Sequence, residues 1–580
     1  MHKNKRIGAV RILILLAVWG MLVLYPNAQE VKSVKHLDSL YNAYLNLRSG
    51  LSMPATQQVE GVEASKSGNK CGFGLAASVW RNYNSFSAEQ RRVLKKLIED
   101  RPVLDTSIVS PSGHFRIHFN TKGDSIPRYD SRLSLRENVL QVAMALDSSY
   151  NYEVNLLHFL PPPSDNGVGG DNLYDVYIAD INSYGYTQPG TSLDQAGLTS
   201  TSYIVIDDNF SDADQVSTFG LNGMYVTAAH ELNHAIQLGS YNALLNNNEL
   251  FFYEATSTAM EELVFDTVND YYYYLRDYFN NPDRPFYDYN SNQIYSIGIW
   301  MLFQHYRFGP DIIRREWEFF HQNPALKAMN MGLTEQNSSF KRALNEFGLW
   351  TYFTGFRKKT GEYFKEGANY PLIRITSSVS FIPPQQTVEI TTQPLTNNFY
   401  RFITDNGKTA DTVVAIITDG DLSSALNNPG SYQSLSYSFY NYAADGARKI
   451  ANNYYARMSS GALDIFAESD IFNNNVAGGQ NFLVGEIDYA FPVPFNYKQN
   501  TQLFIPVIPN KMNTVSIKIF TSSMDLVFSG NKNIVSVSEK YVVEWNAMDS
   551  KNRKLPTGVY IFVTESEGNI KKGKIVIQNE

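Results

Sequence analysis

Two histidines and a glutamate lie within five positions in TAAHELNHAIQLGSY (residues 227–241), in a chain that has 9 histidines. In an α-helix, His230 and His234 are four residues apart, so both imidazoles point the same way and can share one metal ion. Glu231 lies about 100° further around the helix, where its carboxylate can take a proton from water. The spacing therefore predicts a zinc site with two histidine ligands and Glu231 as general base.

A third ligand is expected from the stretch FFYEATSTAMEELVF, in which Glu254 follows His234 by 20 positions. That spacing lets the chain turn back and present a carboxylate from a second helix. Two histidines and one glutamate, with the fourth position left to water, form a hydrolytic zinc arrangement. Glu261 lies seven residues after Glu254, on the same helix face, and is expected to hold a ligand imidazole by a hydrogen bond. The alternative for Glu261 and Glu262 is a solvated helix face.

The elements that must position these residues can be read from hydrophobic periodicity. Residues 113–121, 172–181 and 201–210 are predicted strands, residues 135–152 form an amphipathic helix, and 224–375 are mainly helical. The strand SYIVIDD (202–208), just before the motif helix, is expected to be the edge on which an extended peptide pairs. The fold class predicted for 101–376 is therefore mixed α/β (α+β).

The N-terminal residues predict export. A basic start, MHKNKRIGAVR, is followed by the 14 apolar residues 12–25. A membrane-spanning helix needs about 20 apolar residues, so residues 1–28 are predicted to be a signal peptide, with an uncleaved anchor as the alternative. Residues 29–100 are predicted to be a helical extension or pro-segment, with Ser87 and Gln90 in capping-box spacing. The mature protein is expected to be secreted or on the cell surface.

After residue 376 the helical pattern ends. Residues 377–487 are predicted to form a β-rich accessory domain, and residues 488–580 alternate like the strands of a small sandwich.

Composition sets limits on the class of protein. The 580 residues carry a net charge of −8, with 43% hydrophobic and 18% charged residues, so neither a nucleic-acid partner nor a charged tail is predicted. The single cysteine, Cys71, excludes an intramolecular disulfide. A monomer is expected.

The motif and its context resemble the gluzincins, in which HExxH on one helix is completed by a glutamate on the next. KCGFG, RPVLDTSIVSPSGHFRIHF, LYDVYIADI, AAHELNHAIQ, YEATSTAMEE and IYSIGIWMLFQHYRFGPDIIRREWE are similar to a bacterial family of secreted metalloproteases. This resemblance covers roughly residues 70–355 and implies a zincin-type peptidase domain. By position, His230, His234 and Glu254 would be the ligands and Glu231 the base. Thr258 stands where thermolysin-like enzymes have an aspartate that orients a ligand histidine, which leaves Glu261 for that role.

The C-terminal residues show a second resemblance. Trp545, MDSKNRKLPTG and the run from GVYIFV to GKIVI resemble the Ig-like domain of the flagellar hook-capping protein. Such domains are similar to sorting tails for an outer-membrane secretion system, which would make that machinery a partner. A spacer or stabilising module is the alternative.

Further residues have a candidate role and a plainer alternative. Tyr295, Tyr287, Tyr289 and His305 are candidate oxyanion donors, or else packed aromatic residues. Cys71 could occupy the open zinc position from a pro-segment and keep the enzyme latent, or could be a small buried residue. The loop residues Asp165, Asn166, Asp171 and Asp175 could bind calcium, or could form a solvated turn.

These observations favour a secreted zinc endopeptidase, in which zinc lowers the pKa of water and Glu231 transfers the proton to the leaving amine. One alternative is a non-catalytic surface adhesin or glycan-binding protein with a vestigial zinc site. Another is a zinc hydrolase acting on a non-peptide or glycan-decorated substrate. Glu231 favours an enzyme, because metal binding alone does not need a base.

Overall fold

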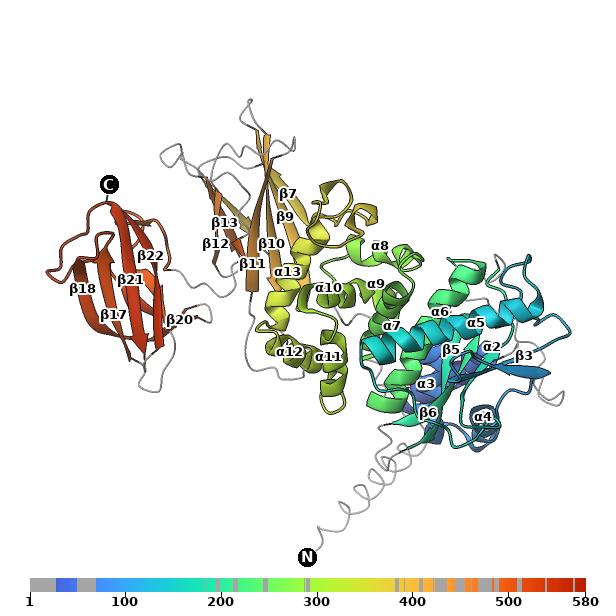
Figure 1. The fold of residues 1–580 in the computed structure, drawn as a ribbon. Helices are drawn as coiled ribbons and strands as arrows, with labels where there is room; N and C mark the ends of the chain where they lie inside the picture. Colours follow the sequence, from blue (N-terminus) through green and yellow to red (C-terminus); the bar gives the residue numbers. More distant parts are fainter. Residues whose placement is uncertain are drawn as a thin grey trace, which may run out of the picture. The chain divides into compact units, whose positions relative to one another are not determined.

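A computed structural model describes most of the chain, including the whole segment that carries the HExxH motif (Figure 1). The described residues are 28–48, 69–181, 183–193, 199–211, 217–243, 249–285, 287, 293–380, 385–390, 392–405, 410–420, 422, 435–443, 454–459, 462–467, 482–483, 490–507, 514–537, 540–566 and 569–579. The predicted signal peptide, apart from Ala28, lies outside them.

The chain forms two compact units, one from residues up to 277 together with 287–328, the other from 278–286 together with 329 onward. Both units contain β-sheets. The chain as a whole combines helices with several sheets, in agreement with the predicted mixed α/β class.

The first unit contains one sheet and most of the helices. Its elements, with α8 and α12 crossing into the second unit, are α2 (Ala28–Leu47), β1 (Asn69–Cys71), α3 (Phe73–Arg81), η1 (Tyr83–Ser85), α4 (Ala88–Glu99), β2 (Thr106–Val109), β3 (Phe115–Phe119), α5 (Leu135–Tyr150), η2 (Asn151–Leu156), β4 (Tyr174–Ile178), β5 (Ser183–Ser192), β6 (Ser200–Ile206), α6 (Gly220–Ile236), η4 (Gln237–Tyr241), α7 (Leu250–Val264), α8 (Tyr272–Asn280), α9 (Gln293–Ser296), α10 (Gly298–Phe308), α11 (Ile312–Phe320) and α12 (Ala325–Glu335).

The strands of this unit form one mixed sheet in the order β1-β5-β6-β4-β3-β2. β3, β4 and β6 are parallel neighbours, whereas β5 runs antiparallel to β6 and β1 runs parallel to β5. The prediction that residues 202–208 form an exposed edge is wrong, because β6 lies between β5 and β4. β5, which the sequence did not predict as a strand, takes the place next to the edge.

Helices cover both faces of this sheet, as two consecutive residues of β5 show. A side chain at Gly185 would meet Thr227 and Glu231 of α6, whereas Tyr186 points into a core formed with α2, α3 and α4. Since successive strand residues face opposite sides, α6 and the helices α2–α4 lie on different faces. Every residue of β6 is buried, as expected for a strand covered on both sides.

The strands predicted around 113–121, 172–181 and 201–210 are present as β3, β4 and β6, and the predicted helix is α5. The capping box of Ser87 and Gln90 begins α4. Residues 29–100 are not wholly helical, because β1 pairs with β5 in the sheet. The segment therefore contributes a strand, as well as helices, to the first unit.

The second unit is mainly β-structure after its helix α13 (Phe340–Tyr352) and the short turns η6 (Gly355–Arg357) and η7 (Gly367–Asn369). A five-stranded sheet has the order β14-β11-β10-β9-β7, and a three-stranded sheet the order β12-β13-β8. Their bounds are β7 (Ser377–Ser380), β8 (Gln385–Glu389), β9 (Thr396–Asp405), β10 (Ala410–Asp419), β11 (Leu435–Ala443), β12 (Tyr454–Ser459), β13 (Ala462–Ala467) and β14 (Phe482–Leu483).

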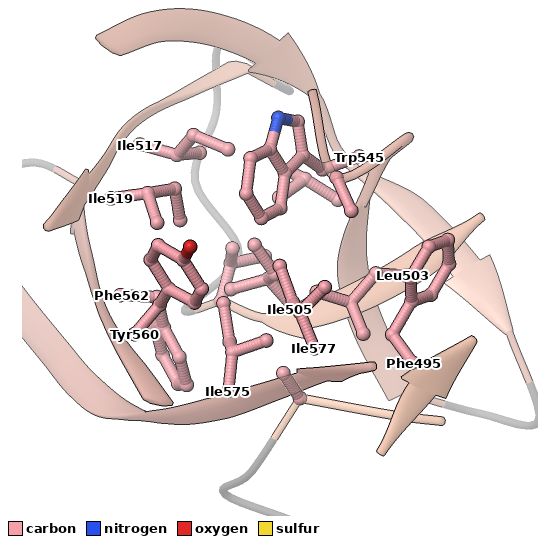
Figure 2. Close-up of a cluster of buried hydrophobic side chains, with 14 of the residues drawn as sticks. Phe495, Leu503, Ile505, Ile517, Ile519, Trp545, Tyr560, Phe562, Ile575 and Ile577 are labelled. Carbon is pink, nitrogen blue, oxygen red and sulfur yellow. The ribbon is translucent and has the colours of Figure 1, made fainter. Parts of the chain in front are cut away.

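The described residues between 490 and 579 form two sheets around a shared core. The sheet β15-β22-β21-β17-β18 and the sheet β16-β20-β19 both contribute to it, and Figure 2 shows Trp545 among isoleucine and aromatic side chains. The strands are β15 (Phe495–Asn496), β16 (Leu503–Pro506), β17 (Thr514–Thr521), β18 (Leu526–Asn533), β19 (Val535–Val537), β20 (Lys540–Trp545), β21 (Gly558–Ser566) and β22 (Asn569–Gln578). Among the described residues, no helix combines the length and apolar character needed to cross a membrane.

Candidate metal centre

The first two candidate ligands lie on α6, which is buried on all sides over its second half. The helix begins at Gly220, whose φ of 56° places it in the left-handed region, and a side chain there would lie 2.6 Å from the carbonyl oxygen of Tyr129. Helical spacing puts His230 and His234 one turn apart, with ring centroids 4.8 Å apart. The helix expected from the sequence thus directs both imidazoles to the same side.

The carboxylates come from α7, the helix that follows. Glu254, Glu261 and Glu262 are all at most 2% exposed, so the solvated helix face proposed for Glu261 and Glu262 is wrong. Seven residues are nearly two helical turns, and Glu254 and Glu261 accordingly both face His230.

The donor atoms of His230, His234 and Glu254 converge. The two Nε2 atoms are 3.1 Å apart, and Oε2 of Glu254 lies 3.1 Å from Nε2 of His230 and 3.6 Å from that of His234. Donors on a tetrahedral zinc ion, with bonds of about 2.0–2.3 Å, lie roughly 3.3–3.8 Å apart. With the sulfur of Cys71, the donors form a group whose atoms all lie within 4.8 Å of one another. The three ligand separations of 3.1, 3.1 and 3.6 Å are close to that range, so these donors are near enough to share one metal ion.

The other nitrogen of each imidazole is held by a side-chain oxygen. Nδ1 of His230 lies 2.6 Å from Oε1 of Glu261, and Nδ1 of His234 lies 2.8 Å from Oε1 of Gln237. Gln237 is oriented in turn, because its NH2 group donates to Oδ1 of Asn233 and to the carbonyl of Tyr253. Since both oxygens are acceptors, each Nδ1 carries the proton and each Nε2 presents its lone pair to a metal.

Glu231 is held beside this group from two directions. Thr187 on β5 places its hydroxyl 2.8 Å from Oε2, and the sulfur of Cys71 lies 3.2 Å from Oε1. Burial raises the pKa of Glu231, and the two histidines oppose that rise. The carboxylate is therefore buried, oriented and of increased basicity, as a general base requires.

The charges of the ligand group are complementary. Burial lowers the pKa of His230, but the hydrogen bonds and charges of Glu254 and Glu261 raise it to about 9. Burial raises the pKa of Glu254, but His234 and His230 lower it to about 2. The carboxylates of Glu254 and Glu261 thus favour positive charge at His230, and a metal ion at Nε2 would supply that charge in place of a proton.

A buried lysine, which the sequence did not single out, extends this network. Nζ of Lys70 lies 2.7 Å from Oε2 of Glu261 and 2.5 Å from Oδ2 of Asp270. The other oxygen of Asp270 accepts hydrogen bonds from the hydroxyls of Ser217 and Thr218. Lys70 therefore links β1 to the residue that orients His230.

Of the four predicted oxyanion donors, Tyr295 is the one that the described contacts bring to the site. Its hydroxyl accepts a hydrogen bond from the backbone N–H of Cys71 at 3.4 Å, and its ring centroid lies 6.4 Å from that of His230. His305 lies on α10 beside Tyr306. Tyr289 lies outside the described residues.

The acidic side chains of the loop considered for calcium have partners from the protein itself. Asp165 pairs with Arg101 at 2.5 Å, Asp171 with Arg116, and Asp175 with His118 at 2.8 Å. Asp175 is only 2% exposed, so a fully solvated turn does not describe the loop either. The ion pairs use the carboxylates that a calcium ion would need.

Thr187, Gln237, Lys70 and Asp270 are the site residues that the sequence did not indicate. Gln237 could have been found by helical spacing, because it lies three residues after His234. The other three come from β5, β1 and a loop, whose positions depend on tertiary structure. No local pattern marks them.

Comparisons with known proteins add little to this geometry. No protein-family model and no curated protein matches the chain. Two solved structures share short similarities: PorZ, a surface component of the type-IX secretion system of Porphyromonas gingivalis, and dimeric latent PorU from the same organism. PorZ is 17% identical over 24% of this chain and 15% of its own, and PorU 15% identical over 34% and 20%. Both TM-scores are 0.13, too low to carry an argument about fold or function.

Proposed function

We propose that the protein is a zinc-dependent endopeptidase of zincin type. The observation that carries this proposal is the convergence of Nε2 of His230, Nε2 of His234 and Oε2 of Glu254 beside the buried carboxylate of Glu231. A metal site that only stabilised the fold would not need an oriented carboxylate next to the ligands.

A zinc ion held by His230, His234 and Glu254 would supply a Lewis acid and lower the pKa of water. The chain's own residues account for the remaining work. Glu231 accepts the water proton and returns it to the leaving amine. Glu261 and Gln237 keep the imidazoles in the tautomer that leaves each Nε2 free. Tyr295, with its hydroxyl near the backbone of Cys71, is the best-placed donor for the developing oxyanion.

A peptide is favoured as substrate by the strand that borders the site. Thr187 of β5 contacts Glu231, and β5 pairs with the extended segment Asn69–Cys71 along its outer edge. The edge of β5 that pairs with this segment lies beside the general base, and without the segment it could hold an extended polypeptide through main-chain hydrogen bonds. This arrangement suits a peptide better than a compact substrate such as a sugar.

A second candidate function rests on Cys71. Its sulfur completes four protein donors, and a closed set of four is typical of structural zinc sites. In that case the protein would be a non-catalytic surface protein, such as an adhesin, in which zinc stabilises the fold. Glu231 favours the enzyme over this alternative.

Export and sorting belong to the same proposal. The apolar N-terminal run supports secretion or display at the cell surface. The core shared by the two C-terminal sheets supports an Ig-like domain. Engagement of an outer-membrane secretion machinery by that domain rests on its sequence resemblance to sorting tails. Alternating buried and exposed residues along β21 agree with such a sandwich.

Zinc content of the purified chain tests the proposal. We expect about one zinc per chain in the wild type, a marked loss in Glu254→Ala, and no loss in Glu89→Ala, an exposed carboxylate on α4. Hydrolysis of a peptide mixture should then depend on the zinc. Absence of zinc after gentle purification and zinc addition would contradict the proposed site.

A further inference from the structure

The segment Asn69–Gly72 lies over the candidate metal centre. β1 pairs in parallel with β5, with Asn69 opposite Ser183 and Cys71 opposite Gly185, and the N–H of Gly72 donates to the carbonyl of Gly185 at 2.9 Å. These pairings use the outer edge of β5. An extended substrate that pairs with this edge would need the same main-chain groups, so the segment and the substrate exclude each other.

The side chain of Cys71 reaches the ligand group. Its sulfur belongs, with His230, His234 and Glu254, to the donors that lie within 4.8 Å of one another, and the residue is 8% exposed. Thiolate is a preferred zinc ligand, and the fourth position of a hydrolytic zinc site is the one that water occupies. A sulfur in that position leaves no place for the water that the reaction needs.

The segment is anchored on both sides of the cysteine. Before it, the buried ammonium group of Lys70 pairs with Glu261 and Asp270. After it, the ring of Phe73 stacks on the imidazole of His234, with centroids 3.9 Å apart and planes at 18°. Both anchors contact the metal site or the residue that orients it, so the position of the cysteine is fixed by the site itself.

We propose that Asn69–Gly72 is an internal inhibitor of the peptidase, in which the Cys71 thiolate is the fourth ligand of the metal and β1 covers the substrate edge of β5. The inference rests on the proposed function and concerns its regulation. Cys71 would hold the metal as a thiolate, and the carboxylate of Glu231, 3.2 Å from the sulfur, is placed to take the S–H proton and to return it if the segment leaves.

Cobalt substitution of the full-length chain tests the ligand. Co²⁺ bound to a thiolate gives a near-ultraviolet charge-transfer band that nitrogen and oxygen ligands do not give, and Cys71 is the chain's single cysteine. We expect the band in the wild type and in the control Ser78→Ala on α3, and its loss in Cys71→Ala with Co²⁺ still bound. Stoichiometric Co²⁺ without the band in the wild type would overturn the inference and leave the proposed function intact.

Peptide hydrolysis tests the inhibition. With zinc bound, we expect Cys71→Ala to cleave an unstructured peptide at least about tenfold faster than the wild type, because water gains the fourth position. Lys70→Met combined with Cys71→Ala should raise the rate further by releasing β1; Asp270 keeps its hydroxyl partners, which limits the cost in folding. Thermal unfolding checks that each variant is folded.

The outcomes separate the two proposals. A thiolate band without hydrolysis by the wild type or by any folded variant would indicate a structural zinc site, and would overturn both inhibition and peptidase. A thiolate band with wild-type hydrolysis that the folded variants do not exceed would overturn the inhibition alone. Failure of wild type and Cys71→Ala to bind Co²⁺ would overturn the metal site as a whole. Activation without a thiolate band would leave the peptidase standing and exclude Cys71 as ligand.

Discussion

Nδ1 of His230 lies 2.6 Å from Oε1 of Glu261, and Oε2 of the same carboxylate lies 2.7 Å from Nζ of Lys70. One carboxylate thus orients an imidazole with one oxygen and receives a buried ammonium group with the other. Removing its charge should affect metal binding without removing a ligand.

We expect Glu261→Gln to weaken zinc binding by about 10–100-fold, because the amide supports the ligand imidazole less well than the carboxylate does. Competition with a chelator measures the dissociation constant. Glu316→Gln is the matched control, since the same change is made at another fully buried glutamate, on α11. Equal affinities for wild type and Glu261→Gln would show that this contact does not support the ligand.

Replacement of the proposed base should separate catalysis from binding. Glu231→Gln should lower kcat by about 10²–10⁴-fold, because the amide cannot accept the water proton, while zinc content stays near one per chain. The assay is best carried out in the Cys71→Ala background, where the fourth metal position is open.

The control for this change is Glu153→Gln, which alters another buried carboxyl group of the same unit. Burial raises the pKa of Glu153 to about 8, against the hydrogen bond from Asn233, so the group is mostly neutral at pH 7 and resembles an amide. Glu153→Gln should retain activity. If both variants, or neither, lose activity, Glu231 has no special role as base.

The raised pKa of Glu153 also predicts that the stability of the protein depends on pH. Its pKa is raised from 4.5 to about 8 on folding, so the folded state binds the proton more tightly than the unfolded state does. Its contribution to stability is therefore complete below pH 4.5 and is lost as the pH rises to 8, by at most about 1.4 kcal/mol per pH unit.

Urea unfolding between pH 5 and 8 measures this effect. The free energy of unfolding of the wild type should fall relative to that of Glu153→Gln as the pH rises, because glutamine does not titrate. If the free energies of unfolding of the two proteins change in parallel between pH 5 and 8, Glu153 is not the group that takes up a proton on folding.

The C-terminal core offers a test that does not involve the metal. Trp545 is fully buried between the two sheets, and its N–H donates to the carbonyl of Met548. Trp545→Ala should cost about 3–5 kcal/mol of unfolding free energy and leave the zinc content unchanged. Tyr541→Ala, at an exposed position of the same strand, should cost much less. Similar losses of unfolding free energy in both variants would argue against Trp545 as a central residue of the core between the two sheets.

The parts of the site that the sequence could predict are those that follow from helix geometry. His230 and His234 share a face because they are one turn apart, and Glu254 and Glu261 share one for the same reason. The strands β3, β4 and β6 were also predictable, because apolar and β-branched residues dominate them.

The remaining parts depend on contacts between distant segments. β5 contains Gly185, Pro189 and Gly190, which are poor strand formers, so its sequence does not indicate a strand. Gly185 is nevertheless required there, because a side chain would lie 2.8 Å from Thr227 and 3.0 Å from Glu231. The pairing of β1 with β5 joins residues more than a hundred positions apart, and no local pattern determines such a pairing.

The contacts of α2 and of Arg48, the residue that follows it, would hold the helix in place in a chain that is cut between α2 and β1. Tyr44 donates a hydrogen bond to Gln188 at 2.6 Å, and Arg48 donates one to Tyr203 at 2.7 Å, all of them within the first unit. A cut at residues 49–68 would remove the covalent link but not these contacts. Retention of the helix would then become a bimolecular equilibrium, so the cut fragment would dissociate on dilution and remain bound at high protein concentration.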